Sequence, residues 1–376
     1  MPDGRKTSPF GTNLSYAPAL DGIRALAVGL VLYQHWIDHP WIDRHLPVST
    51  GLVGVKLFFV LSGLLITRIL LVTRFEESST LAAGLRSFYL RRALRIFPLY
   101  YMVLLVLALT SAPFRGLWPW YVTYLQNLRM VRAGHFLFAS HLWTLAIEEQ
   151  FYLVWPLLLF TLPVRRIGPV LLAMVPLAVG WRVVGCSLLR WNDLQVSLFT
   201  LSSLDSLGLG GLLAWLLFGG QRPSNRALAV VGAVGVGIVA ASAMGGHFFV
   251  VVLSDTGVSL AAFALIGAVA EDAPAWLEVP LAARPLVALG RISYGVYVYH
   301  FFVSSQMVGL GRCLFALGGR PLLVAGELAV TLLLATLSWR LLEKPINDLK
   351  NRWAPRVPVR GMNAPDEPRP SQGRSR

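Results

Sequence analysis

The sequence predicts an all-α protein that crosses a membrane many times, because three observations about the chain agree. Of its 376 residues, 55% are hydrophobic and only 14% are charged, whereas a soluble domain has about 25% charged residues. Apolar runs of about 20 residues, the length of a membrane-spanning helix, recur along most of the chain. The 12 Trp and 11 Tyr residues are of the types that anchor helices at membrane interfaces.

Ten apolar segments are predicted to span the membrane. They are residues 18–36, 52–72, 96–111, 141–161, 167–186, 198–219, 227–244, 247–270, 290–310 and 321–342. The third segment is short, and residues 118–128 are expected to form an interfacial helix. We expect one transmembrane domain over residues 1–347, followed by a disordered basic tail, residues 348–376, that is rich in Pro, Arg, Gly and Ser.

The distribution of basic residues predicts the orientation in the membrane. Most Lys and Arg residues fall in the N-terminal segment, the even-numbered loops and the C-terminal tail. Because cytoplasmic loops are enriched in Lys and Arg, both termini are expected in the cytoplasm. These loops and the tail also account for the net charge of +14, so no nucleic-acid partner is expected.

Two further features of the chain limit its class. Cys186 and Cys313 lie in different segments, without the spacing of a disulfide framework or a metal site. The first 20 residues lack the apolar core and small-residue cleavage site of a signal peptide. The first apolar segment is therefore expected to remain as a helix. From the cysteine spacing, no metal site is expected.

The first span presents two polar side chains on one helical face. Arg24 and His35 are eleven positions apart, which is about three helical turns and about 16 Å along the axis. Arg24 is therefore expected near the cytoplasmic end and His35 near the outer end. The structural alternative is an arginine that reaches the interface with its long side chain, together with an interfacial histidine.

The fourth span carries polar side chains that are costly inside a bilayer. Glu148 follows His141 by seven positions, which predicts nearly the same face and a position about 10 Å deeper. Glu149 points about 100° away. A carboxylate near an imidazole orients the ring and raises its basicity. The structural alternative for either glutamate is an ion pair with an arginine of a neighbouring helix.

Three arginines precede the third span. Arg91, Arg92 and Arg95 lie about one turn apart on a helix that leads into Pro98. Because guanidinium groups bind phosphate oxygens through paired hydrogen bonds, the spacing suits a phosphate clamp. The excess of basic residues in cytoplasmic loops is an alternative reason for arginines at this place.

The second and ninth spans carry weaker signals. Ser62 and Gly63 are small residues that let a helix or a ligand approach closely. The ninth span contains Tyr294, Tyr297 and His300. His300 is interpreted either as a ligand contact or as a structural histidine held by a hydrogen bond.

Six stretches of the chain form a set in a fixed order. They are LDGIRALAVGLVLYQH, GVKLFFVLSGLLITRIL, FYLRRALRIFPLYY, HLWTLAIEEQFYLVWP, ISYGVYVYH and LLEKPIN. The most specific part is Arg24 with His35 after ten intervening residues, combined with HLWTLAIEEQFY. Together the six stretches resemble the membrane-bound acyltransferase family 3 over residues 19 to about 347, nearly the whole chain.

The resemblance implies a multi-pass O-acyltransferase of the bacterial cytoplasmic membrane. Such enzymes take an acyl group, often acetyl, from acyl-CoA and transfer it to a hydroxyl of a carbohydrate. The expected acceptors are a surface polysaccharide, lipopolysaccharide or exopolysaccharide, and the alternative acceptor is a secondary metabolite such as a macrolide. Acyl-CoA is a substrate here, so no permanently bound cofactor is expected.

The resemblance also implies roles for single residues. His35 matches the catalytic histidine of the family, and Arg24 matches the partner arginine of the same motif. Apart from the resemblance, we expect Glu148 or Glu149 to orient the ring of His35. The candidate donor-binding residues are Arg24, Ser62, Arg91, Arg92 and Arg95. The candidate acceptor-binding residues are His141, Trp143, Tyr152, Tyr299 and His300.

One departure from the family and one rival class bear on this interpretation. Family members often carry Arg two positions before the residue that matches Asp205, where this chain has Ser203. The structural alternative for Asp205 is a helix-packing contact. The rival class is a proton-coupled transporter or flippase, in which the Arg, His and Glu residues form a relay. The sequence has no clear internal repeat, which disfavours a transporter built from inverted halves.

Overall fold

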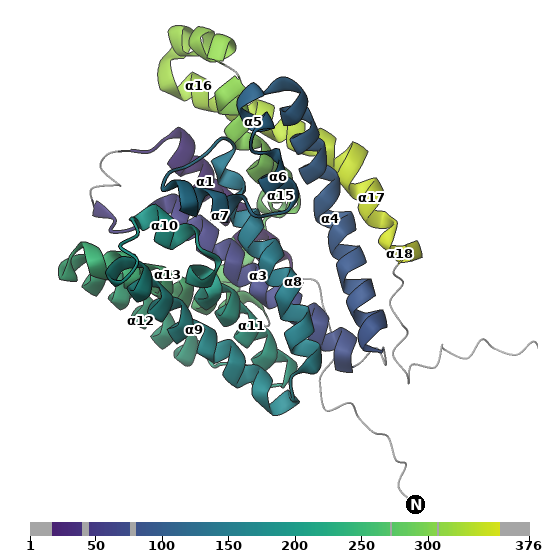
Figure 1. Cartoon of the computed structure of the whole chain (residues 1–376), viewed down its shortest axis with the longest axis vertical. Coiled ribbons are helices and arrows are strands. Elements are labelled where there is room, and N and C mark those ends of the chain that lie inside the picture. The colour runs from purple at the N-terminus through teal and green to yellow at the C-terminus, as the bar shows by residue number, and fades with distance from the viewer. Residues whose placement is uncertain (1–16, 40–44, 76–79, 271–272, 307, 354–376) are drawn as a thin grey trace, which may run out of the picture.

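The computed structural model describes residues 17–39, 45–75, 80–270, 273–306 and 308–353. Within these residues, all regular secondary structure is helical, which confirms the predicted class. In chain order the α-helices are α1 (Pro18–Trp36), α3 (Thr50–Phe75), α4 (Leu81–Thr110), α5 (Ala112–Arg115), α6 (Trp118–Val122), α7 (Gln126–Ala133), α8 (Trp143–Thr161), α9 (Val164–Ser187), α10 (Asp193–Leu198), α11 (Leu204–Phe218), α12 (Asn225–Gly245), α13 (His247–Ala270), α14 (Ala275–Leu281), α15 (Arg284–Gln306), α16 (Val308–Ser338), α17 (Lys344–Asp348) and α18 (Lys350–Trp353). Figure 1 shows the long helices side by side, with α4 and α17 at the right and α9, α12 and α13 at the lower left.

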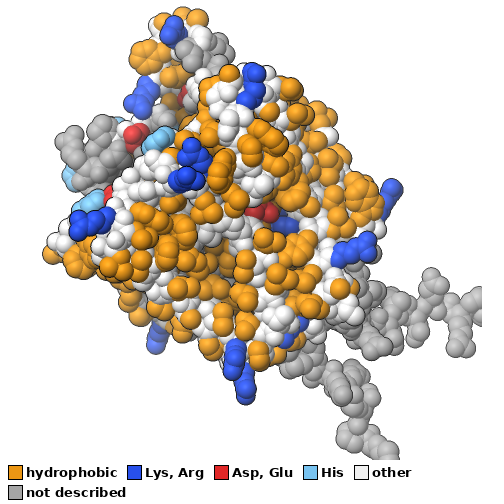
Figure 2. All heavy atoms as spheres, viewed as in Figure 1, with side chains coloured by type: hydrophobic (Ala, Val, Ile, Leu, Met, Phe, Trp, Pro, Cys, Tyr) orange, Lys and Arg blue, Asp and Glu red, His pale blue; other side chains and the backbone are white. Residues whose placement is uncertain are grey.

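Eight helical segments in the described part of the chain are long and apolar enough to cross a membrane. They belong to α3, α4, α9, α11, α12, α13, α15 and α16. The protein is therefore a multi-pass membrane protein, and Figure 2 shows apolar side chains over most of the visible face, with many basic side chains near its margins. The other two predicted spans form α1 and α8, both of which carry charged side chains.

Several predicted boundaries differ from the structure. The third predicted span, 96–111, is the second half of one 30-residue helix, α4, which passes through Pro98 without ending. The predicted interfacial helix at 118–128 is divided between α6 and α7. Helix also continues into the predicted tail as far as Trp353, and residues 354–376 lie outside the described part of the chain.

Glycines allow α3 and α11 to cross closely. A Cβ atom added to Gly63 would lie 2.1 Å from the carbonyl oxygen of Leu207, and one added to Gly210 would lie 2.0 Å from that of Val60. No larger residue fits at such a backbone contact, which confirms the prediction that Gly63 permits close approach.

Buried ion pairs tie α3, α9, α11 and α13 together. Arg182 donates to Asp205, and Thr256 donates to the same carboxylate at 2.7 Å. Lys56 pairs with Asp255 at 2.7 Å. Asp205 thus makes a helix-packing contact, in agreement with the structural alternative, and its guanidinium partner comes from α9 instead of from position 203.

Candidate active site

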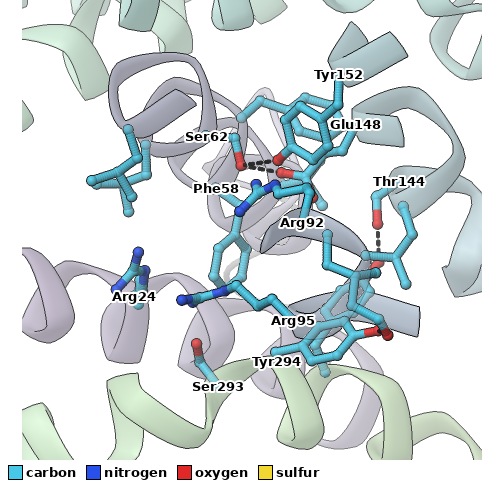
Figure 3. A pocket seen from close by; sticks show the side chains of 17 residues that line it. Arg24, Phe58, Ser62, Arg92, Arg95, Thr144, Glu148, Tyr152, Ser293 and Tyr294 are labelled. Carbon is cyan, nitrogen blue, oxygen red and sulfur yellow. Dashed lines mark hydrogen bonds between the residues drawn. The ribbon is translucent and has the colours of Figure 1, made fainter. Parts of the chain in front are cut away.

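A cavity of about 120 Å³ lies between α1, α3, α4, α8 and α15. Its polar lining residues are Arg24, Ser62, Arg92, Arg95, Thr144, Glu148, Tyr152, Ser293, Tyr294 and Tyr297. Most of these lie in Figure 3, where Arg92 and Arg95 point into the cavity from one helix and Arg24 lies on the opposite side from Thr144. The structure thus brings four predicted donor-binding residues into one cavity, namely Arg24, Ser62, Arg92 and Arg95.

Arg92 lies among aromatic and acidic neighbours in this cavity. Its guanidinium carbon lies 4.2 Å from the centre of the Tyr152 ring, and it interacts electrostatically with Glu148 and Glu149. Its Nε is buried and has no hydrogen-bond partner among the described residues. Because buried polar atoms are nearly always paired, this donor is available to a group that enters the cavity.

Glu148 belongs to the cavity wall and does not contact the predicted catalytic imidazole. Within the described residues, it accepts a hydrogen bond from the Ser62 hydroxyl, which in turn accepts one from Tyr152 at 3.0 Å. The orientation of His35 by Glu148 stays a prediction, and the contact that the structure shows for this carboxylate is with Ser62. Glu149 interacts electrostatically with Arg92, and its Oε1 is buried without a hydrogen-bond partner among the described residues.

His141 is not part of helix α8. It lies in the 3₁₀ turn Ser140–Leu142, which precedes the helix. His141 and Glu148 contact different neighbouring helices. His141 contacts α15, where its Nε2 lies 3.1 Å from the carbonyl of Val298, whereas Glu148 contacts α3.

A second cavity, of about 170 Å³, continues the cationic surface toward the N-terminal half of α4. Arg92 and Arg95 line both cavities. Arg91 and Lys350 line the second cavity alone, and the Arg91 Nε donates to Ser87 at 3.3 Å. The predicted clamp of three arginines thus extends over two adjoining cavities, with Lys350 as a further cation that the sequence interpretation placed in the disordered tail.

Three imidazoles gather at the other end of α1. The ring centres of His35 and His300 are 4.9 Å apart, and those of His141 and His300 are 5.3 Å apart. His141 and His300 are buried, whereas His35 is exposed. The sequence placed these residues on three different predicted segments, and only the packing of α1 and α15 with the turn before α8 brings them together.

The backbone contacts of these rings determine which nitrogen carries the proton. The Nδ1 of His35 lies 2.9 Å from the carbonyl of Val31. A carbonyl oxygen only accepts, so Nδ1 is the protonated atom and Nε2 of the neutral ring keeps its lone pair. By the same argument, the unpaired ring nitrogens are Nε2 in His300, whose Nδ1 contacts the Tyr297 carbonyl, and Nδ1 in His141. An exposed Nε2 on His35 is suited to accept a proton from a substrate.

Other candidate residues lie outside the cavity. Trp143 and Tyr299 are half-buried in the hydrophobic core and do not line the cavity, whereas Tyr152 does. Within the part of the chain that the structure describes, no group of His, Cys, Asp and Glu has the arrangement of a metal site. Thr144 was missed by the sequence interpretation, although a hydroxyl between His141 and Glu148 in an apolar run was a usable signal.

Comparisons with known proteins identify the family of the chain. A family model described as an acyltransferase domain, of acyltransferase family 3, matches residues 18–340. The chain is 30% identical over 367 residues to an O-acetyltransferase OatA of Staphylococcus aureus (strain NCTC 8325 / PS 47), with 88% of this chain and 57% of the relative covered. It is 28% identical over 374 residues to a peptidoglycan O-acetyltransferase OatA of Listeria monocytogenes serovar 1/2a, with 88% and 56% covered. The chain thus spans somewhat more than half the length of these relatives, and no solved structure matches it.

Proposed function

The chain belongs to acyltransferase family 3, and from that premise we propose that it is a membrane O-acetyltransferase that moves an acetyl group from acetyl-CoA to a hydroxyl of a carbohydrate. The names of its relatives, among them a peptidoglycan O-acetyltransferase, support a cell-envelope glycan as acceptor. The protein lies in the cytoplasmic membrane, with the Arg91 end of the bundle in the cytoplasm, in keeping with its basic loops.

The observation that carries the proposal is the cationic surface that continues from one cavity into the next. Arg91 and Lys350 bind the phosphates of CoA in the second cavity. Arg92 and Arg95, which line both cavities, hold the part of the donor that reaches into the first. Guanidinium groups suit this task because they bind phosphate oxygens through two parallel hydrogen bonds. The unpaired Arg92 Nε is the donor that the bound substrate satisfies.

The imidazole cluster supplies the base for the transfer. The Nε2 of His35 takes the proton from the acceptor hydroxyl, whose oxygen attacks the thioester carbon. The C–S bond then breaks, and the CoA sulfur takes up the proton as the ester is released. General-base catalysis by a positioned imidazole contributes about 100- to 10,000-fold to such a rate.

An experiment in cells tests the proposed function. We express the chain in a bacterium that lacks glycan O-acetylation and measure base-labile acetate on its isolated cell-envelope glycans by mass spectrometry. The wild type is expected to add acetyl esters, and His35→Ala is expected to add none while reaching the membrane in equal amount. Acetate on an excreted small molecule in place of the glycans would identify a secondary-metabolite acceptor. Transport of a solute without any new ester would indicate the transporter class.

A further inference from the structure

A buried tyrosine lies next to both the cavity and the imidazole cluster. Tyr297 lines the cavity, and none of the three histidines of the cluster does. The centre of the Tyr297 ring lies 6.2 Å from that of Phe58, another lining residue. It also lies 5.8 Å from the ring of His141 and 5.5 Å from the ring of His300. The phenol ring therefore adjoins both the wall of the cavity and two of the three imidazoles.

Two hydrogen bonds hold the ring in this position. The Tyr297 hydroxyl donates to the carbonyl of His141 at 2.6 Å. It also lies 2.7 Å from the hydroxyl of Thr144, and because its only proton is given to the carbonyl, the Thr144 hydroxyl is the donor in this second bond. Tyr297 is 7% exposed, so neither bond competes with bulk water.

We propose that Tyr297, fixed by Thr144, is the residue that determines which acyl groups pass from the cavity to the imidazole cluster. The pair, called here the Tyr297–Thr144 barrier, closes the cavity when no acceptor is bound. The ring must turn aside for the acyl carbon to meet the acceptor oxygen, and the space that it then leaves limits the length of the acyl chain. This inference rests on the proposed function and assigns the selectivity of the same site.

The barrier also protects the donor from water. In hydrolysis, a water oxygen bonds to the acyl carbon, the C–S bond breaks, and the second proton of water passes to the CoA sulfur. That reaction is promoted by the same imidazole base as transfer. With the barrier closed, the exposed His35 and the thioester lie on opposite sides of Tyr297, so acyl-CoA is held intact until an acceptor arrives.

Acyl-CoA hydrolysis without acceptor measures how firmly the barrier closes. The purified full chain in detergent is supplied with acetyl-CoA or hexanoyl-CoA, and the free thiol of CoA is quantified. Tyr297→Phe keeps the ring but removes both hydrogen bonds, and hydrolysis of acetyl-CoA is expected to rise about tenfold. Thr144→Val keeps the bulk and removes one bond, so a rise of about threefold is expected.

Enlarging the passage tests the selectivity itself. Tyr297→Ala removes the ring, and the ratio of hexanoyl-CoA to acetyl-CoA turnover is expected to rise about tenfold or more above that of the wild type. The matched control is Tyr100→Phe. Tyr100 is also buried, and its hydroxyl donates to the carbonyl of Tyr121 and accepts from Gln126, but it lines neither cavity. The control is expected to keep wild-type hydrolysis and selectivity.

The outcomes separate this inference from the proposed function. Two results together support the barrier. The rate of hydrolysis increases from the wild type to Thr144→Val and again to Tyr297→Phe, and the ratio of hexanoyl-CoA to acetyl-CoA turnover rises in Tyr297→Ala. Hydrolysis at the wild-type rate in Thr144→Val and Tyr297→Phe overturns the barrier. An equal loss of turnover with both donors in every variant also overturns it, because that result indicates that Tyr297 and Thr144 have a structural role. If the wild type transfers acetyl groups and the variants match it in hydrolysis and selectivity, the barrier is overturned and the proposed function stands. A wild type that consumes no acyl-CoA with a glycan present overturns the proposed function as well.

Discussion

At His35, one hydrogen bond to the backbone determines which ring nitrogen is available as a base. The Val31 carbonyl, one helical turn earlier, fixes the proton on Nδ1. A carboxylate partner is therefore not needed to select the tautomer, and Glu148 contacts Ser62 on α3. Among the three imidazoles His35 is the exposed one, so under the proposed function it is the ring that the acceptor hydroxyl meets.

At Arg92, substitution is expected to affect donor binding more than the chemical step. Arg92→Ala removes charge-assisted hydrogen bonds to the donor, each of which contributes about 1.5–3 kcal/mol, so KM for acetyl-CoA is expected to rise about 10- to 100-fold. Arg92→Lys keeps the positive charge but lacks the planar guanidinium group, so its KM for acetyl-CoA is expected to lie between the values of the wild type and of Arg92→Ala. Steady-state kinetics of the purified protein measures both.

The control for Arg92 lies on the same helix. Arg86 is an exposed arginine of α4 that lines neither cavity, and Arg86→Ala is expected to keep the wild-type KM. An unchanged KM in Arg92→Ala, or an equal rise in Arg86→Ala, would contradict the binding of the donor by Arg92.

At this scale the sequence predicted several of the residues that line the cavity, but not their contacts. A charged or titratable side chain in an apolar run is visible in any sequence, and Arg24, Ser62, Arg92, Arg95 and Tyr152 do line one cavity. The contact of Glu148 with Ser62 on another helix depends on how the helices are rotated about their axes. One sequence contains no information on which helix each face meets.

At the scale of the helices, the crossing of α3 and α11 is expected to be the most sensitive contact to added volume. Gly210→Ala places a methyl group 2.0 Å from the carbonyl oxygen of Val60, and overpacking of this kind costs about 1–3 kcal/mol. A lower melting temperature in detergent is therefore expected, together with reduced activity, because Ser62 lies on α3 beside this crossing.

Gly237 of α12 supplies the matched control for that substitution. A Cβ atom added there meets nothing within 4 Å, and Ala is favoured over Gly in a helix by about 1 kcal/mol. Gly237→Ala is expected to keep or raise the melting temperature. Equal melting temperatures for Gly210→Ala and the wild type would show that the two helices separate at little cost.

Helix boundaries were predicted less well than helix positions, for a physical reason. The predicted third span began at 96 because Arg91, Arg92 and Arg95 are costly in lipid. In the structure, Arg92 and Arg95 point into a cavity inside the protein, so α4 continues through them. In the same way, α1 and α8 carry charge because α1, α3, α4, α8 and α15 enclose the polar cavity.

At the scale of the whole molecule, the cationic side chains and the imidazoles lie toward different ends of the bundle. The cationic cavities lie toward the N-terminal half of α4, and the imidazoles lie at the C-terminal end of α1. Arg24 and His35 mark the two ends of one helix, about 16 Å apart. The sequence predicted this polarity from α1 alone. The barrier between the ends was not predictable, because it depends on the contact of Tyr297 with Thr144 across two helices.

The central claim is that the protein couples cleavage of acetyl-CoA at one end to esterification of a hydroxyl by way of His35 at the other. The most direct measurement uses vesicles that contain the purified protein, with acetyl-labelled acetyl-CoA on the Arg91 side and chitopentaose on the His35 side. The account predicts one labelled ester for each CoA released, a decrease of about 100-fold or more in His35→Gln, and no decrease in His135→Gln, which changes an exposed histidine. Label that crosses the membrane without CoA release, or a wild-type rate in His35→Gln, would contradict it.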